Sequence, residues 1–205
     1  MKPVVIGIAG GSASGKTSVA SALCQAFAEE VVVLSQDCYY SAHDELSLEA
    51  RTHLNYDRPE AFDNALLRTQ LQQLLAGDTI DRPVYDFATH TRAATVVTLT
   101  PKPVIIVEGI LVLADPALRA LMDIRLFVDT PADVRVLRRI QRDTQVRGRQ
   151  LDEVIAQYLS SVRPAHVAFV APTRMLADVI IPSGGHNQIA LDLLTTKIQA
   201  ILAKR

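Results

Sequence analysis

The sequence predicts an α/β fold, a five-stranded parallel sheet flanked by helices, and three features of its 205 residues support this. Short β-branched runs without polar alternation are typical of strands buried on both faces of a parallel sheet. Helical patterns separate these runs. The length fits one domain with a full hydrophobic core, so we expect a single domain over residues 1–205. The expected strands are 4–9, 31–35, 104–108, 124–129 and 179–182.

Two helical segments have clear apolar faces. In the segment 17–29, Val19, Leu23 and Phe27 recur every four residues and therefore share one face. The final segment, 188–203, is also amphipathic and is expected to complete the fold.

Local signals mark the ends of other helices. Asp63 is suited to cap a leucine-rich helix that Gly77 can end. The segment 130–133 predicts another start, with proline at the first helical position and an acid in the first turn. Pro164 is expected to kink or end the helix that begins near Leu151, because proline lacks a backbone N–H.

The segment 79–99 interrupts the alternation of strands and helices. It is rich in β-branched and aromatic residues and has no helical pattern, so we expect a small β-hairpin insertion. Insertions on a rigid scaffold often determine specificity.

Composition excludes several classes of protein. The formal net charge of −1 gives no general attraction to nucleic acid or acidic membranes. Cys24 and Cys38 lack the spacing of a zinc site or a disulfide framework. Glycines interrupt the apolar run after Lys2 too early for a signal peptide, and the most apolar stretch, 104–114, contains Glu108. We therefore expect a soluble, cytoplasmic protein that binds neither nucleic acid nor membrane.

A phosphate-binding motif follows the first expected strand. The segment 10–17 matches G-x-x-x-x-G-K-[ST] and lies between a strand and a helix, as the motif requires. Glycines let backbone N–H groups approach a phosphate, and a helix N-terminus favours anions. The sequence therefore predicts a P-loop NTPase fold that binds a nucleoside triphosphate. The expected loop contacts are Gly10, Gly11, Ser12, Ala13, Ser14, Gly15, Lys16 and Thr17.

Two residues are candidates for holding Mg²⁺. Thr17 offers a hydroxyl, and Glu108 ends the third expected strand, where it can hold the ion directly or through water. A buried acid at the end of a strand can instead cap a neighbouring helix. Lys16 is expected to supply positive charge to the β- and γ-phosphates.

The phosphate loop alone does not distinguish a kinase from a GTPase switch or a motor ATPase. The sequence has no Asn-Lys-x-Asp element of the kind that recognises guanine, and it is short for a motor. A small-molecule kinase is therefore favoured.

Motifs on the acceptor side make the prediction more specific. The segment 35–40 follows the second strand, and the segments 55–59, 83–92 and 139–149 come later in the chain. With these motifs in this order, the sequence resembles the uridine/cytidine kinase family over nearly its whole length. The resemblance implies ATP-dependent phosphorylation of the 5′-hydroxyl of uridine and cytidine to UMP and CMP, in pyrimidine salvage. It also implies a homotetramer.

The resemblance assigns roles to individual residues. Asp37 matches the acid that accepts the proton of the 5′-hydroxyl, and Lys16 completes the expected catalytic pair. Asp57 matches the acid that binds the ribose hydroxyls, since a carboxylate can accept two hydrogen bonds from a diol. The other implied nucleoside contacts are Tyr40, Tyr85, His90, Arg139, Arg149 and Gln157.

The residues alone leave other interpretations open. Asp37 is also suited to cap a helix, Tyr85 to pack in the hairpin core and His90 to lie exposed in its turn. Arg135 and Arg138 recur at helical spacing and also fit a solvated helix face.

An arginine-rich helical lid is expected over residues 138–150. The resemblance implies that Arg142 and Arg147 close over the phosphates, where guanidinium groups neutralise charge and help to exclude water. His186 is a further expected ATP contact. Members of the family usually have arginine where Ser183 stands, which alters the expected contacts with the donor nucleotide.

Two alternative functions remain. Another kinase of the same branch, acting like a phosphoribulokinase or a pantothenate kinase, would share the loop and the acid after the second strand, but the segment 85–90 argues against it. A non-catalytic nucleotide-dependent switch would need only the loop and the Mg²⁺ residues.

Overall fold

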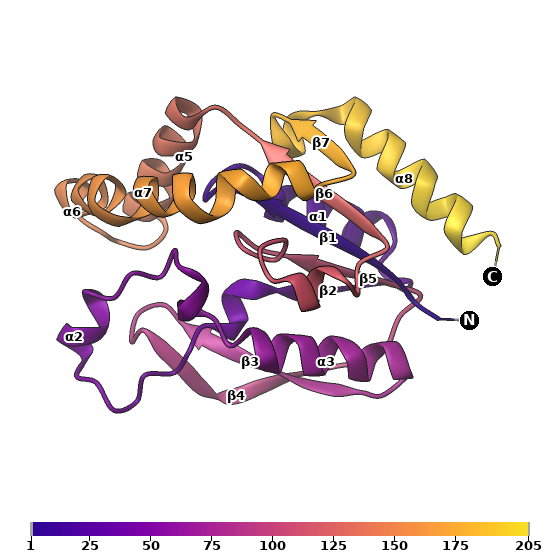
Figure 1. The fold of residues 1–205 in the computed structure, drawn as a ribbon, viewed down its shortest axis with the longest axis horizontal. Helices are drawn as coiled ribbons and strands as arrows, with labels where there is room; N and C mark the ends of the chain where they lie inside the picture. Colours follow the sequence, from indigo (N-terminus) through magenta and orange to yellow (C-terminus); the bar gives the residue numbers. More distant parts are fainter. Residues whose placement is uncertain (1, 205) are drawn as a thin grey trace.

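The computed structural model describes residues 2–204, and a five-stranded parallel sheet forms its centre (Figure 1). The strands are β1 (Val4–Gly10), β2 (Val31–Ser35), β5 (Val104–Glu108), β6 (Ile124–Asp129) and β7 (Val179–Pro182). They lie in the order β2-β5-β1-β6-β7, and all their pairings are parallel. The five predicted strands are confirmed, and β1 is one residue longer than expected.

Helices cover both faces of the sheet, because successive residues of a strand point to opposite faces. Ile6 of β1 packs in one apolar cluster with α1 and α8, whereas Val5 packs in the other with α3 and α4. The bounds of these helices are α1 (Lys16–Ala26), α3 (Asn64–Ala76), α4 (Pro116–Arg119) and α8 (Gln188–Leu202). In the described part of the chain, every helix is too short or too polar to span a bilayer.

The predicted helix-end signals at Asp63, Gly77 and Pro131 hold to within a residue. The Asp63 side chain accepts a hydrogen bond from Leu66 N at 2.9 Å and caps α3, and Gly77 ends this helix with a φ of 97°. Pro131 is the N-cap of α5 (Ala132–Gln145) rather than its first helical residue, as the sequence had suggested.

Of the two outcomes expected at Pro164, a kink or an end, the end is not found, because the chain stays helical on both sides of the proline. After α6 (Leu151–Gln157), the chain continues through α7 (Arg163–Ala165) in an unbroken series of helical turns. Residues 158–162 and 166–170 form π-turns, which are wider than α-helical turns. The wider turn before Pro164 makes room for the proline ring, so the helical path passes the proline.

The expected hairpin consists of β3 (Ile80–Asp86) and β4 (Thr91–Leu99), which pair antiparallel apart from the main sheet. Figure 1 shows this hairpin and α2 (Leu48–Thr52) on one side of the sheet, and α5, α6 and α7 on the other. Both groups extend past the carboxyl ends of the parallel strands, where α/β sheets bind ligands.

Candidate active site

The phosphate-binding loop joins β1 to α1, in the context that the motif predicts. Gly15 is the N-cap of α1, and its φ of 99° is a left-handed conformation that glycine adopts without strain. A Cβ at this position would lie only 3.3 Å from the backbone of Gly184 and Gly185, in the turn after β7. The turn therefore packs closely on the loop, and a larger residue at position 15 would need the turn to shift as well as a strained backbone.

A cleft opens beside the loop on the side expected for the donor nucleotide. The predicted ATP contacts that line it are Ala13, Gly15, Lys16, Thr17, Arg142, Arg147 and His186. Ser12 lines a neighbouring cavity instead. The remaining loop residues, Gly10, Gly11 and Ser14, are buried. Ser14 acts as a support, because its carbonyl oxygen accepts a hydrogen bond from Thr130 Oγ1 at 2.8 Å.

The candidate metal ligands meet at the inner end of this cleft. Thr17 Oγ1 donates a hydrogen bond to Glu108 Oε2 at 3.3 Å, and Ser35 Oγ donates one to Glu108 Oε1 at 2.6 Å. Glu108 is only 3% exposed, and this burial raises the pKa of its carboxyl group, while the nearby Lys16 opposes the rise. The recorded hydrogen-bond partners of Glu108 are side-chain hydroxyls rather than helix N–H groups, so the geometry favours a ligand role over a helix cap.

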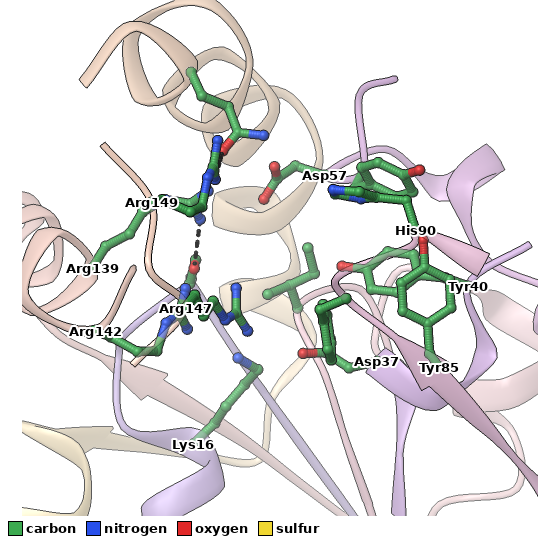
Figure 2. Close-up of a pocket in the computed structure, with 15 residues that line it drawn as sticks. Lys16, Asp37, Tyr40, Asp57, Tyr85, His90, Arg139, Arg142, Arg147 and Arg149 are labelled. Atoms are coloured by element: carbon green, nitrogen blue, oxygen red, sulfur yellow. Dashed lines mark hydrogen bonds between the residues drawn. The ribbon is translucent and has the colours of Figure 1, made fainter. Parts of the chain in front are cut away.

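A second cavity adjoins the cleft and gathers every predicted nucleoside contact (Figure 2). These residues are Asp37, Tyr40, Asp57, Tyr85, His90, Arg139, Arg149 and Gln157. Figure 2 shows the arginines on one side, and Tyr40, Tyr85 and His90 on the other. The residues shared by the cleft and the cavity are Lys16, Asp37, Tyr85, Phe87, Arg142 and Arg147. The two spaces are therefore contiguous, and Lys16 and Asp37 stand where they meet.

The aromatic side of the cavity forms a connected set of rings. The Tyr40 ring centroid lies 5.0 Å from that of Tyr85, and the His90 ring stacks on Tyr56 with centroids 5.4 Å apart. Tyr85 is both a buried core residue and part of the cavity lining, so its packing in the core does not exclude the predicted nucleoside contact. The sequence analysis did not identify Tyr56 and Phe87 as lining residues, although both lie beside predicted contacts in the quoted motifs.

His90 is not an exposed turn residue. It has a φ of 51° at the tip of the hairpin, is half-buried and faces the cavity. Burial lowers the pKa of its imidazole, and the neighbouring Arg149 lowers it further.

Two acids face the cavity from separate segments. Asp37 lies within the 3₁₀ helix Gln36–Tyr39, whose N-cap is Ser35, so it does not cap this helix. Asp57 is held in a tight turn, because its backbone N–H donates a hydrogen bond to Asn55 Oδ1 at 3.0 Å. Burial raises the pKa of the Asp57 carboxyl group, and Arg139 opposes this.

The arginines of α5 do not form a solvated face. Arg135 is 7% exposed, and its Nε donates a hydrogen bond to Thr130 O at 3.0 Å. Arg138 Nη1 lies 3.5 Å from Ser14 O and the side chain lines the cleft beside the phosphate loop. Both side chains are therefore turned toward the phosphate loop, because this face of α5 packs against it.

An acid that the sequence analysis did not identify lies among the other arginines. Asp143 is fully buried, and its carboxylate is within 4 Å of four guanidinium groups. Its spacing was a usable signal, since Arg139 and Arg147 lie four residues before and after it on and just beyond α5.

The chain is similar to known proteins over nearly its whole length. The profile of the Phosphoribulokinase / Uridine kinase family matches residues 5–190. A uridine kinase of Oceanobacillus iheyensis is 53% identical over 99% of this chain and 97% of its own. One of Bacillus cereus strain B4264 is 55% identical over 100% of this chain and 97% of its own. A solved phosphoribulokinase from Rhodobacter spheroides covers 88% of this chain and 70% of its own with a TM-score of 0.65 and 14% identity, which shows a shared fold.

Proposed function

Because the chain belongs to the phosphoribulokinase/uridine kinase family, we propose that it transfers the γ-phosphate of ATP to the 5′-hydroxyl of uridine or cytidine. The products would be UMP and CMP, as in pyrimidine salvage. The main supporting observation is that two spaces meet at Lys16 and Asp37: the cleft beside the phosphate loop, here called the donor cleft, and the cavity lined by the predicted nucleoside contacts, here called the nucleoside cavity. A bound acceptor can therefore present its hydroxyl to a bound donor at these two residues.

The shape of the cavity favours a nucleoside over a sugar phosphate. Tyr85 and His90 provide flat surfaces against which a pyrimidine can lie. Asp57 offers a carboxylate to the ribose diol, between these rings and Arg139. Neither a sugar phosphate nor pantothenate has a base, so either would leave the aromatic wall uncovered. This is the argument against a phosphoribulokinase-like or pantothenate kinase-like acceptor.

The catalytic groups suit phosphoryl transfer, in which the protein mainly positions the reactants and stabilises charge. Asp37 orients the 5′-hydroxyl and accepts its proton as the oxygen–phosphorus bond forms. Lys16 neutralises charge on the phosphates, and Arg142 and Arg147 reach the same space from the lid. The bond from the γ-phosphorus to the bridging oxygen breaks, and ADP leaves.

The oxygen donors near Lys16 fit Mg²⁺. Thr17 and Glu108 would hold the ion, and both supply the hard oxygen ligands that it prefers. When bound, the ion supplies positive charge to the transferring phosphoryl group. Among residues 2–204, no three His, Cys, Asp or Glu side chains converge on a metal site, which fits an ion that also binds phosphate oxygens and water.

A nucleotide-dependent switch is the alternative from another class. It would need the donor cleft but not the acceptor cavity, so its ATP hydrolysis would be indifferent to nucleoside. The deciding experiment measures ADP release with uridine, cytidine, adenosine, pantothenate and ribulose 5-phosphate in parallel. ADP release that requires uridine or cytidine supports the proposal. ADP release that requires another acceptor, or that occurs equally without any acceptor, contradicts it.

A cytoplasmic homotetramer is also part of the proposal. Ile189 and Leu193 are exposed four residues apart on α8, and Val179 and Ile180 are exposed on the edge strand β7. Apolar side chains on an open edge are suited to contact another copy of the chain. Light scattering in solution should give a mass of four chains, and the mass of one chain would contradict the tetramer.

A further inference from the structure

Four arginines of the lid surround one buried carboxylate. We call them the arginine cluster: Arg139, Arg142, Arg147 and Arg149. The carboxylate at its centre, Asp143, has no exposed surface. Four guanidinium groups brought this close would repel one another, so the negative charge of Asp143 is needed to hold them together.

The two oxygens of Asp143 hold different arginines. Oδ1 lies 2.8 Å from Arg142 Nε and 3.5 Å from Arg147 Nη1. Oδ2 lies 3.5 Å from Arg139 Nε and 3.8 Å from Arg149 Nη1. The carboxylate therefore divides the cluster into two pairs.

Of the arginine cluster, only one of these pairs lines the donor cleft. Arg142 and Arg147, the Oδ1 pair, line the donor cleft as well as the nucleoside cavity. Arg139 and Arg149, the Oδ2 pair, line the nucleoside cavity. These two also donate hydrogen bonds to Gln157 Oε1, at 2.8 and 2.7 Å, so a second acceptor holds them on that side.

We propose that Asp143 is a positioning residue whose Oδ1 sets the arginines for the donor phosphates and whose Oδ2 sets those for the nucleoside. This inference rests on the proposed function, because it takes the cleft as the donor site and the cavity as the nucleoside site. Asp143 touches neither substrate and acts through the arginines.

The two oxygens of Asp143 differ in how strongly they hold their arginines, and this difference gives a sharp test. Oδ1 accepts a hydrogen bond from Arg142 Nε, whereas, within the described chain, Oδ2 and Arg139 Nε are buried without any hydrogen bond. In Asp143→Asn, the amide oxygen should keep the place of Oδ1, and the amide NH₂ should face Arg139 and Arg149 and repel them. The nucleoside side should therefore lose more affinity than the donor side.

The experiment measures dissociation constants by calorimetry, for uridine and for a non-hydrolysable β,γ-imido analogue of ATP. In Asp143→Asn, the uridine constant should rise about tenfold or more and the analogue constant by less than about threefold. In Asp143→Ala, which removes both oxygens, both constants should rise about tenfold. The control is Asp178→Asn, which breaks the partly exposed ion pair with Arg125 on the distant β6–β7 edge and should leave both constants unchanged.

The inference would be overturned if the dissociation constants of the Asp143 variants changed no more than those of the control. It would also be overturned if both constants rose equally in Asp143→Asn. Circular dichroism and thermal unfolding show whether each variant is folded. If removal of the negative charge prevents folding, Asp143→Glu serves as the second variant. It keeps the charge but displaces both arginine pairs by the length of one methylene. Both constants should then rise, and unchanged constants in this folded variant would also overturn the inference. Wild-type enzyme that fails to phosphorylate uridine would contradict the proposed function instead.

Discussion

Ser35 and Glu108 are paired in register as the last residues of β2 and β5, and Ser35 Oγ donates a hydrogen bond to Glu108 Oε1 at 2.6 Å. This contact fixes a buried carboxylate beside the phosphate loop. Burial raises the pKa of Glu108, so the ionised form is disfavoured by the fold. A site that holds such a charge gives up stability for function.

We predict that Glu108→Gln stabilises the protein and impairs its activity. A carboxyl whose folded pKa is raised contributes stability below its unfolded pKa and loses it as pH rises through the folded value. The neutral amide avoids this loss. The variant's gain in stability over the wild type should therefore be largest at neutral pH and vanish in acid. A gain of about 1 kcal/mol would raise Tm by roughly 2–4 °C in a chain of this size.

The hydroxyls of Ser35 and Thr17 can turn to match the amide, so Glu108→Gln should fold normally. Its kcat should fall, and the Mg²⁺ concentration needed for half-maximal rate should rise. Thermal unfolding across pH tests the first part, and Mg²⁺ titration of ADP release tests the second. A lower Tm at neutral pH, or an unchanged Mg²⁺ dependence, would contradict the role assigned to Glu108.

The proposed base gives a second prediction. Asp37→Asn should lower kcat by roughly 10²–10⁴-fold and change the uridine dissociation constant by less than about tenfold, since the carboxylate acts mainly in the transition state. Lys16→Ala should abolish transfer. Asp44→Asn is a matched control, because Asp44 contacts Thr91 Oγ1 at 2.7 Å outside the cavity. Near-normal kcat in Asp37→Asn would rule out the base.

The strands were predictable from sequence because their burial on both faces removes polar residues over their whole length. The continuation of the helical turns past Pro164 was not predictable, because it depends on contacts between residues that are distant in sequence. Val162, Ala165 and Val170 are all almost fully buried, so packing stabilises the helical turns on both sides of the proline. A local rule about proline cannot include this contribution.

The site was predictable where a motif fixes the backbone, as in the phosphate loop. Asp143 was missed because an acid in an arginine-rich helix also fits an ordinary exposed ion pair. Only the fold shows that its side chain is fully buried among guanidinium groups. For the same reason the sequence left a solvated face open for Arg135 and Arg138, since helical spacing does not reveal which face of α5 packs on the loop.

The turn after β7 gives a third prediction. Ser183 is exposed with a φ of 64°, and two residues that follow it, Gly185 and His186, line the donor cleft. Ser183→Arg should place a cation at the edge of this cleft and lower the KM for ATP about threefold to tenfold, as an exposed charge contact contributes on the order of 1 kcal/mol. The KM for uridine should not change. Ser183→Gln, long but uncharged, is the control, and an unchanged KM for ATP in Ser183→Arg would show that this position does not reach the donor.

The position of His90 predicts that both uridine and cytidine are accepted. The two bases differ at position 4, where uridine has a carbonyl acceptor and cytidine an amino donor. A neutral imidazole can serve either, because its contacting nitrogen carries a proton in one tautomer and a lone pair in the other. A fixed partner would leave one base unpaired, at a cost of about 1–3 kcal/mol.

Protonation of His90 removes the choice between the two tautomers. The surroundings of the imidazole determine the pH at which it is protonated. Imidazolium has only donors, which suits uridine and repels the cytidine amino group. Burial and then Arg149 and Arg51 lower the pKa of His90, while Asp86 opposes them. The ratio of kcat/KM for cytidine to that for uridine should therefore stay level from about pH 8 to about 6.5 and fall only at lower pH. His90→Phe should lower kcat/KM for both nucleosides and remove the fall of the ratio at low pH. Arg149→Gln should move this fall to higher pH. A ratio that stays constant down to the acid limit of stability, in wild type and both variants, would contradict the tautomer mechanism even if both nucleosides are substrates.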